Sequence, residues 1–146
     1  PNPIVALCDD CHTGSTGLTS EDGMGLFTRL DTKRNGIEVK SDYGFEAVSG
    51  DISDRGGFSV PSARNLSVTG PYMHDGRFET LIDVLSHYNT EMSSTHLPDE
   101  PLIRDGKPLR LGLDETDKQA VVAFVEMLTD EFFLTNPAFA DPFSKD

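Results

Sequence analysis

The sequence predicts an all-α domain in which long loops wrap a cofactor, and three observations lead to this fold class. Residues 80–90 and 114–129 carry apolar side chains at helical spacing. Residues 1–57 are rich in glycine and only weakly periodic, as loops are. A Cys-x-x-Cys-His motif near the start provides reactive groups around which loops could close. At 146 residues the chain is expected to form one domain with a modest core.

The first predicted helix covers residues 80–90. Thr80 is a suitable N-cap because its side-chain oxygen can accept a hydrogen bond from a backbone N–H of the first turn. Positions i, i+3, i+4 and i+7 are taken by Leu81, Val84, Leu85 and Tyr88. These positions share one face of a helix, so Tyr88 is expected to point to the same side as the leucines.

The second predicted helix starts after Asp114 and ends near Thr129. Asp114 can act as the N-cap, and Glu115 and Asp117 place negative charge in the first turn, where the helix dipole favours it. Its apolar face consists of Val121, Phe124, Val125 and Leu128. We expect this face to pack against the cofactor or the N-terminal part of the chain, with ordinary core packing as the alternative.

Prolines predict irregular structure between and after the two helices. Three prolines between positions 98 and 108 exclude a long helix in the connection. The tail 132–146, which holds Pro137 and Pro142, is expected to be extended and to lie along the surface. The chain therefore divides into the motif and its loops at 1–57, a segment ending in the first helix at 58–90, and the connection, second helix and tail at 91–146.

Cys8, Cys11 and His12 form the Cys-x-x-Cys-His motif, which contains both cysteines of the chain. At this spacing two thiols can bond covalently to both vinyl groups of a haem, and the adjacent histidine can supply an axial nitrogen to the iron. The motif therefore predicts a cytochrome c-like domain with one covalent haem c. His12 is the expected proximal ligand.

The motif has three other interpretations. A structural zinc site needs further paired ligands, such as a second Cys-x-x-Cys, and the sequence has none. A thioredoxin-like redox pair needs stabilised thiolates, which the carboxylates of Asp9 and Asp10 would oppose. A structural disulfide is the third alternative.

The charge balance limits the classes of partner. With 12 basic and 25 acidic residues the net charge is −13, which argues against nucleic acid and against anionic membrane surfaces. An acidic surface favours docking to a basic patch on a redox partner, with solubility alone as the other explanation. The longest apolar run, at residues 120–125, is too short to span a membrane. Because bacteria attach haem c outside the cytoplasm, we expect a periplasmic or extracytoplasmic protein.

A second axial ligand would decide between electron transfer and chemistry on peroxide. A thioether raises the reduction potential and suits electron relay, whereas a phenolate lowers it and suits oxidised iron. The side chains that could bind are Met24, Met73, Met92, Met127, His74, His87, His96 and Tyr88.

Several sequence runs carry a resemblance to a known family. V-P-S-A-R-N-L at 60–66, L-S-V-T-G-P-Y-M-H-D-G at 66–76 and T-L at 80–81 resemble the C-terminal haem domain of the bacterial diheme cytochrome c peroxidase/MauG family. V-S-G-D at 48–51 and L-T-D-E at 128–131 agree with this. The resemblance covers about residues 8–143, with the motifs in the family's order and spacing.

The resemblance implies a position for the distal iron ligand. In the family this ligand lies fourteen residues after the histidine of P-Y-x-H-D-G, which is Tyr88 here. Peroxidase-type members have methionine at that position and MauG-type members have tyrosine. Met92, His87 and Met73 are the alternatives, and a core tyrosine with a satisfied hydroxyl is the structural explanation of Tyr88.

Two further site predictions follow from the family. The backbone carbonyls of Thr69 and Pro71 match positions that bind a calcium ion between two haem domains, and carbonyl oxygens suit this hard cation. Arg64, with Asn65 beside it, is expected near the haem rim, where its guanidinium could pair with a propionate. A solvated arginine is the alternative.

The predicted function is that of a haem c electron-transfer domain, which relays electrons to a catalytic haem or a redox partner. The alternative is a haem enzyme that acts directly on hydrogen peroxide, as a peroxidase or by MauG-like high-valent haem oxidation, with His74 or His87 handling protons. The sequence has one haem motif and no tryptophan, unlike the diheme peroxidases. Alone, the chain is therefore expected only to transfer electrons. Its partner would be a redox protein or a second haem domain, with a basic docking patch.

Overall fold

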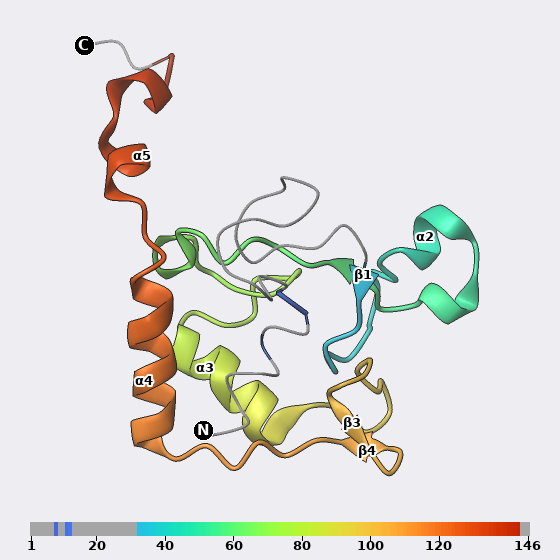
Figure 1. The fold of residues 1–146 in the computed structure, drawn as a ribbon. Coiled ribbons are helices and arrows are strands. Elements are labelled where there is room, and N and C mark those ends of the chain that lie inside the picture. Colours follow the sequence, from blue (N-terminus) through green and yellow to red (C-terminus); the bar gives the residue numbers. More distant parts are fainter. Residues whose placement is uncertain (1–7, 9–10, 13–31, 144–146) are drawn as a thin grey trace, which may run out of the picture.

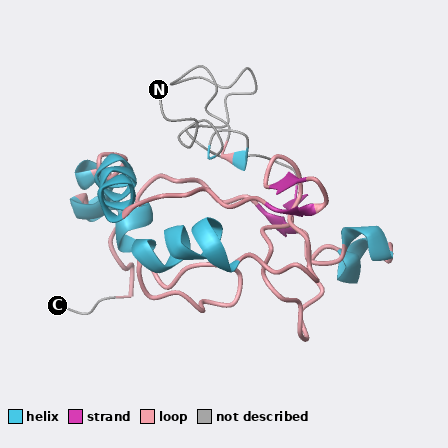
Figure 2. Ribbon diagram, turned by 90° about the horizontal axis from the view of Figure 1, so that it is seen from below, coloured by secondary structure: helices cyan, strands magenta, loops and turns pink. Residues whose placement is uncertain are grey.

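The computed structural model describes residues 8, 11–12 and 32–143 (Figure 1). Its α-helices are α2 (Glu46–Ser49), α3 (Leu81–Ser86), α4 (Glu115–Glu126) and α5 (Glu131–Thr135), and its strands are β1 (Thr32–Lys33), β2 (Phe58–Ser59), β3 (Ile103–Arg104) and β4 (Lys107–Pro108). Short 3₁₀ turns lie at Ile52–Asp54, Leu66–Val68 and Pro137–Phe139. Long irregular segments join these elements (Figure 2).

The prediction of an all-α fold is wrong, because the described residues contain two small antiparallel sheets. In the first sheet Thr32 pairs with Ser59 and Lys33 with Phe58. This pairing ties together segments that are far apart in the chain. Because each strand has only two residues, neither shows the period-two pattern by which a strand is recognised in a sequence.

The second sheet is a hairpin with a local cause. Ile103 pairs with Pro108 and Arg104 with Lys107, and Asp105 and Gly106 form the loop between the strands. Both loop residues have positive φ, at 53° and 71°. Asp-Gly is a preferred dipeptide for such a two-residue hairpin turn. The Asp-Gly dipeptide is thus a local sequence signal for this hairpin.

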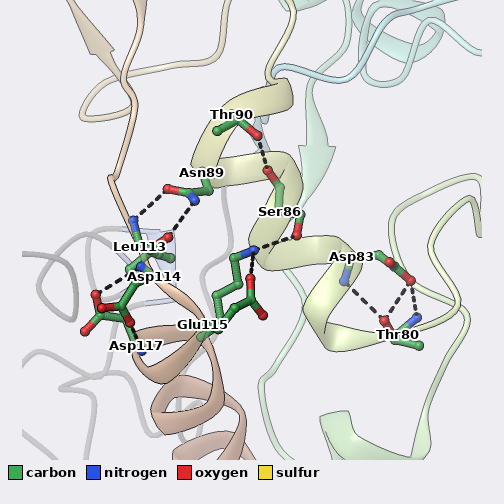
Figure 3. A network of polar contacts seen from close by, with 10 residues as sticks. Thr80, Asp83, Ser86, Asn89, Thr90, Leu113, Asp114, Glu115 and Asp117 are labelled. Atoms are coloured by element: carbon green, nitrogen blue, oxygen red, sulfur yellow. Dashed lines mark hydrogen bonds and ion pairs between the residues drawn. The ribbon is translucent and has the colours of Figure 1, made fainter.

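The first predicted helix is confirmed in its N-terminal half. The Thr80 side chain accepts from the Asp83 N–H at 3.2 Å, and the Asp83 carboxylate accepts from the Thr80 N–H at 3.1 Å, which completes a capping box (Figure 3). The α-helix ends at Ser86 and continues as a π-helical turn, η3 (His87–Glu91). Such turns widen a helix locally and are frequent at functional sites. Tyr88 lies within this turn.

The second predicted helix is confirmed with its cap. The Asp114 carboxylate accepts from the Asp117 N–H at 2.8 Å in a second capping box. Helix α4 packs against α3, where Lys118 Nζ donates to Ser86 Oγ at 3.2 Å (Figures 1 and 3). Phe124, from the predicted apolar face, is 44% exposed.

The tail is not extended as predicted. It forms α5 and a 3₁₀ turn, because Asp130 caps the helix by accepting from the Phe133 N–H at 3.0 Å and Pro137 starts the turn. The rings of Phe133 and Phe139 stack at 4.9 Å. The tail is exposed, but it projects beyond the end of α4 and does not lie along the surface as predicted (Figure 1).

The core of the described residues is small. Its buried apolar side chains are Ile37, Val60, Ala63, Met92, Leu102 and Leu113. Asn89 fixes one edge of this core, since its amide donates to the Leu113 carbonyl at 2.9 Å and accepts from the Leu113 N–H at 2.8 Å (Figure 3). Among the described residues, no helix combines the length and the apolar character of a membrane span.

Candidate haem site

The three residues of the Cys-x-x-Cys-His motif lie on one helical turn. The His12 N–H donates to the Cys8 carbonyl at 2.8 Å, which closes the turn. Cys8 is exposed, whereas Cys11 and His12 are half-buried. The turn therefore presents both thiols and the imidazole from one short element, at the surface of the described domain.

The His12 imidazole is oriented by a distant backbone group. Its Nδ1 lies 3.0 Å from the carbonyl oxygen of Pro61. A carbonyl can only accept, so Nδ1 carries the hydrogen and Nε2 carries the lone pair. This is the tautomer in which Nε2 binds a metal, held by the type of outer contact that iron-binding histidines use. The residues present thus fit a haem with His12 as proximal ligand. Sequence reasoning gave Pro61 no role, and nothing local links it to a residue 49 positions away.

Tyr88 lies in the π-helical turn η3. Burial of its hydroxyl raises the pKa well above the usual value of a phenol, and the thiols of Cys11 and Cys8 raise it further. A hydrogen bond with the Asn35 side chain acts in the opposite direction. The charges of both motif cysteines therefore act on this phenol.

Asn35 is a site residue that sequence reasoning missed. Its Nδ2 donates to Met73 Sδ at 3.3 Å, and its carbonyl oxygen lies 2.8 Å from His87 Nε2. It thus connects two of the predicted iron-ligand candidates. No sequence motif includes Asn35, because its contacts are with Met73 and His87, which lie 38 and 52 positions later in the chain.

The other ligand candidates have different surroundings. Met92 is 2% exposed and packs beneath Gly36, where an added Cβ would lie 2.9 Å from Met92 Cβ. His87 is 4% exposed, its Nε2 lies 2.8 Å from the Asn35 carbonyl, and burial lowers its pKa. Met73 has a left-handed φ of 71°, with its sulfur held by Asn35.

Of the remaining candidates, His74, His96 and Met127 lie within the described residues. His74 is exposed and stacks on Phe58, with the ring centroids 3.8 Å apart. His96 is half-buried and bonds Thr95, with Nδ1 and Oγ1 3.2 Å apart. Met127 is 80% exposed on the end of α4. Met24 lies outside the described residues.

The positions matched to calcium and to the haem rim are on the surface. Thr69 and Pro71 are exposed on either side of Gly70. Arg64 is exposed, whereas Asn65 is buried, and its side-chain oxygen accepts from the Asp130 N–H at 2.6 Å. Asn65 therefore joins its loop to the start of α5. In the part of the chain that the structure describes, no three His, Cys, Asp or Glu side chains cluster as a metal site.

Comparisons with known proteins agree with this site. The cytochrome-c peroxidase IdrP2 of Denitromonas iodatirespirans is 37% identical over 98 residues, 66% of this chain and 24% of the relative. The methylamine utilization protein MauG of Paracoccus denitrificans is 39% identical over 106 residues, 61% of this chain and 27% of the relative. The chain thus spans about a quarter of the length of these curated relatives. No family model matches the chain.

A solved structure extends the similarity to nearly the whole chain. A MauG-like protein associated with microbial copper homeostasis superposes with a TM-score of 0.68 at 30% identity, covering 95% of this chain and 47% of that one. The relatives are haem proteins, and with the paired cysteines and the oriented histidine they define a haem c protein domain. The chain belongs to the cytochrome-c peroxidase/MauG family and fits its C-terminal haem domain.

Proposed function

We propose that this chain is a haem c electron-transfer domain, which relays electrons to a catalytic haem or a redox partner. The observation that carries the proposal is the bond from His12 Nδ1 to the Pro61 carbonyl, on the turn that also holds Cys8 and Cys11. It supports one covalent haem with His12 as proximal ligand. When bound, haem c supplies an iron that cycles between ferrous and ferric states at a potential set by its axial ligands. The exposed Cys8 keeps the attachment point within reach of a partner.

Tyr88 is the distal ligand in this proposal. Its place in the π-helical turn, where the charges of both motif cysteines act on it, supports this role. Met92 and His87, the neighbouring alternatives, are buried against Gly36 and the Asn35 carbonyl. A side chain in the sixth position excludes peroxide from the iron, which favours electron relay over direct peroxide chemistry.

A second candidate function is direct action on hydrogen peroxide, and the same phenol favours it. An anionic oxygen ligand stabilises oxidised iron, which reactive haem proteins require. Loss of this ligand would open the iron to peroxide. His74, which is exposed, is then the side chain for proton transfer, since the Nε2–H of His87 is engaged by the Asn35 carbonyl.

The partner in the proposal is a redox protein or a second haem domain with a basic docking patch. The net charge of −13 supports electrostatic attraction to such a patch. The tail offers apolar area beside its acidic residues, with Phe132 73% and Phe143 86% exposed. The MauG-like structure contains about as much chain again as this domain covers, which leaves room there for a second domain.

Three finer assignments belong to the same proposal. The exposed Arg64 pairs with a haem propionate, and the backbone carbonyls of Thr69 and Pro71 bind calcium at the junction with a second domain. The protein acts in the periplasm or outside the cell, where haem c is attached. The family relationship supports each of these assignments.

Spectroscopy of the haem-loaded chain tests the proposal. Haem should remain with the polypeptide after denaturation and acid extraction, and Cys11→Ala should reduce this retention. The ferric protein should be six-coordinate, accept electrons from a small donor and turn over little peroxide. Haem that is lost on extraction would overturn the proposal. Rapid peroxide turnover by five-coordinate iron would instead favour the second function.

A further inference from the structure

The loop that carries the Pro61 carbonyl is held at both of its ends. On its N-terminal side it follows strand β2, which pairs with β1. On its C-terminal side it ends at Asn65, whose backbone N–H donates to the Leu128 carbonyl at 3.2 Å. Between these two points the side chains of Val60 and Ala63 are buried in the core. The Pro61 carbonyl is therefore presented from a short segment with two fixed ends.

The C-terminal attachment of this loop also uses side chains. Asn65 is 7% exposed, and its Oδ1 accepts from the Asp130 N–H at 2.6 Å. Two residues later in the chain, Ser67 Oγ and Thr129 Oγ1 lie 2.7 Å apart. With the backbone bond to Leu128, these contacts form a joint between the loop and the end of α4. The described structure thus fixes this end of the loop through three bonds to three adjacent residues.

The backbone of Asn65 has a conformation that few residue types adopt. Its φ of 59° and ψ of 18° lie in the left-handed region, which asparagine tolerates and glycine adopts freely. The carbonyl of Asn65 accepts from the Val68 N–H at 3.0 Å, which closes the 3₁₀ turn that follows. The position therefore calls for a residue that accepts a positive φ and also offers an oxygen to Asp130, and asparagine does both.

The segment between Pro61 and Asn65 is short and stiff. Three residues separate the two, and within this stretch the Arg64 N–H donates to Ser62 Oγ at 3.1 Å. The carbonyl of the buried Ala63 accepts a further backbone hydrogen bond, and the ring of Pro61 fixes its own φ. Because the segment has little freedom of its own, a displacement of Asn65 also displaces the Pro61 carbonyl.

We propose that Asn65 is a positioning residue for the proximal histidine. By fixing the loop to the end of α4, it holds the Pro61 carbonyl within hydrogen-bond distance of His12 Nδ1. The inference rests on the proposed role of His12 as iron ligand. A hydrogen bond weakens steeply with distance and misalignment, so release of the joint weakens the bond from His12 to Pro61. Nε2 then becomes less basic, which favours ferrous over ferric iron.

The test removes the Asn65 side chain and keeps its backbone conformation. Asn65→Gly retains the left-handed φ and loses only the oxygen that accepts from Asp130. In the haem-loaded variant the ferric-to-ferrous equilibrium constant should move toward ferrous iron by roughly threefold, as expected for weakening one hydrogen bond. In the reduced protein the His12 Nδ1–H should exchange with deuterium faster, as followed by NMR. Ser67→Ala weakens the same joint more mildly, should act in the same direction, and serves if the glycine variant does not fold.

A double variant tests whether Asn65 acts through the Pro61 carbonyl. Since Asn65→Gly and Pro61→Gly weaken the same hydrogen bond, the potential shift of the double variant should be smaller than the sum of the two single shifts. Asn136→Gly is the matched control. Its Oδ1 also accepts from a backbone N–H, that of Ala138 at 2.9 Å, but it lies in the tail beyond the joint. This variant should keep the potential and the exchange rate of the parent protein.

Three results would overturn the positioning role of Asn65. They are a parent-like potential and exchange rate in the folded joint variants, full additivity with Pro61→Gly, and an equal shift in Asn136→Gly. A response to Pro61→Gly without one to Asn65→Gly removes only this role and leaves the haem assignment standing. Loss of haem from the parent protein on acid extraction removes the proposed function, and the inference with it.

Discussion

The imidazole of His12 donates its Nδ1–H to the carbonyl oxygen of Pro61 at a distance of 3.0 Å. This bond orients the ring, and in a haem held by His12 it would make Nε2 more basic and so favour ferric over ferrous iron. Because proline has a fixed φ, Pro61 also limits the movement of the accepting segment. In the proposed haem site, the contact would therefore link the geometry of this loop to the reduction potential of the iron.

A first prediction concerns this loop. Pro61→Gly keeps the carbonyl and loosens the backbone, so the hydrogen bond to His12 should weaken and the reduction potential should rise. The ferric-to-ferrous equilibrium constant should change a few-fold, which corresponds to a free energy on the order of 1 kcal/mol. A spectroelectrochemical titration measures it. Pro108→Gly, in the β3–β4 hairpin, is the control and should leave the potential unchanged. An equal shift in both variants would contradict the role of Pro61.

A second prediction concerns the phenol. Tyr88→Phe removes only the hydroxyl, so the fold should remain while the ferric spectrum changes from phenolate-ligated to another coordination state. Tyr72→Phe is the matched control, since the Tyr72 hydroxyl donates to the Leu66 carbonyl at 2.9 Å. That variant should lose about 1 kcal/mol of stability and keep its spectrum. An unchanged spectrum in Tyr88→Phe would end the assignment of Tyr88 as a ligand.

A third prediction concerns the edge of the core at Asn89. Asn89→Leu leaves the N–H and the carbonyl of Leu113 without their amide partner. The free energy of unfolding should fall by roughly 2–4 kcal/mol, the cost of two unsatisfied buried backbone groups. Asn136→Ala, which removes an N-cap at the surface tail, should cost only about 1 kcal/mol. Denaturant titrations followed by circular dichroism compare the two, and equal losses would argue against a core role for Asn89.

A fourth prediction separates backbone strain from steric overlap at two glycines. Gly36 and Gly106 have similar positive φ values, +73° and +71°, but an added Cβ meets Met92 at 2.9 Å at Gly36 and open space at Gly106. Gly106→Ala should cost about 1 kcal/mol for the left-handed conformation alone. Gly36→Ala should cost roughly 1–3 kcal/mol more, because the core must move. Similar melting temperatures for the two variants would show that the Met92 contact yields easily.

Local patterns account for the parts of the fold that were predicted correctly. Thr80 and Asp114 begin their helices as predicted, because each cap is satisfied by a residue three positions later. The hairpin at Asp105 was missed although its Asp-Gly signal is local. The pairing of Thr32 with Ser59 has no local signal, so no pattern within either segment predicts it.

The residues of the candidate site also divide into those with a local sequence signal and those without one. Both cysteines and His12 are recognisable because covalent haem attachment requires adjacent residues at one spacing. Family resemblance and a position on a helical face both predict Tyr88 as the distal ligand. Neither predicts the change from an α-helix to a π-helical turn at this residue. Asn35 and Pro61 carry no motif, and their roles depend on which backbone and side-chain groups the fold brings together.

The sequence by itself determined the haem-attachment motif, the starts of the two main helices and the strong negative charge, since each depends on neighbouring residues or on composition. Only the tertiary structure decided the tautomer of His12, the surroundings of Tyr88 and the position of Asn35. The bonds from His12 to Pro61 and from His87 to Asn35 span 49 and 52 residues. The physical reason is that a hydrogen bond acts over about 3 Å in space, whatever the separation along the chain.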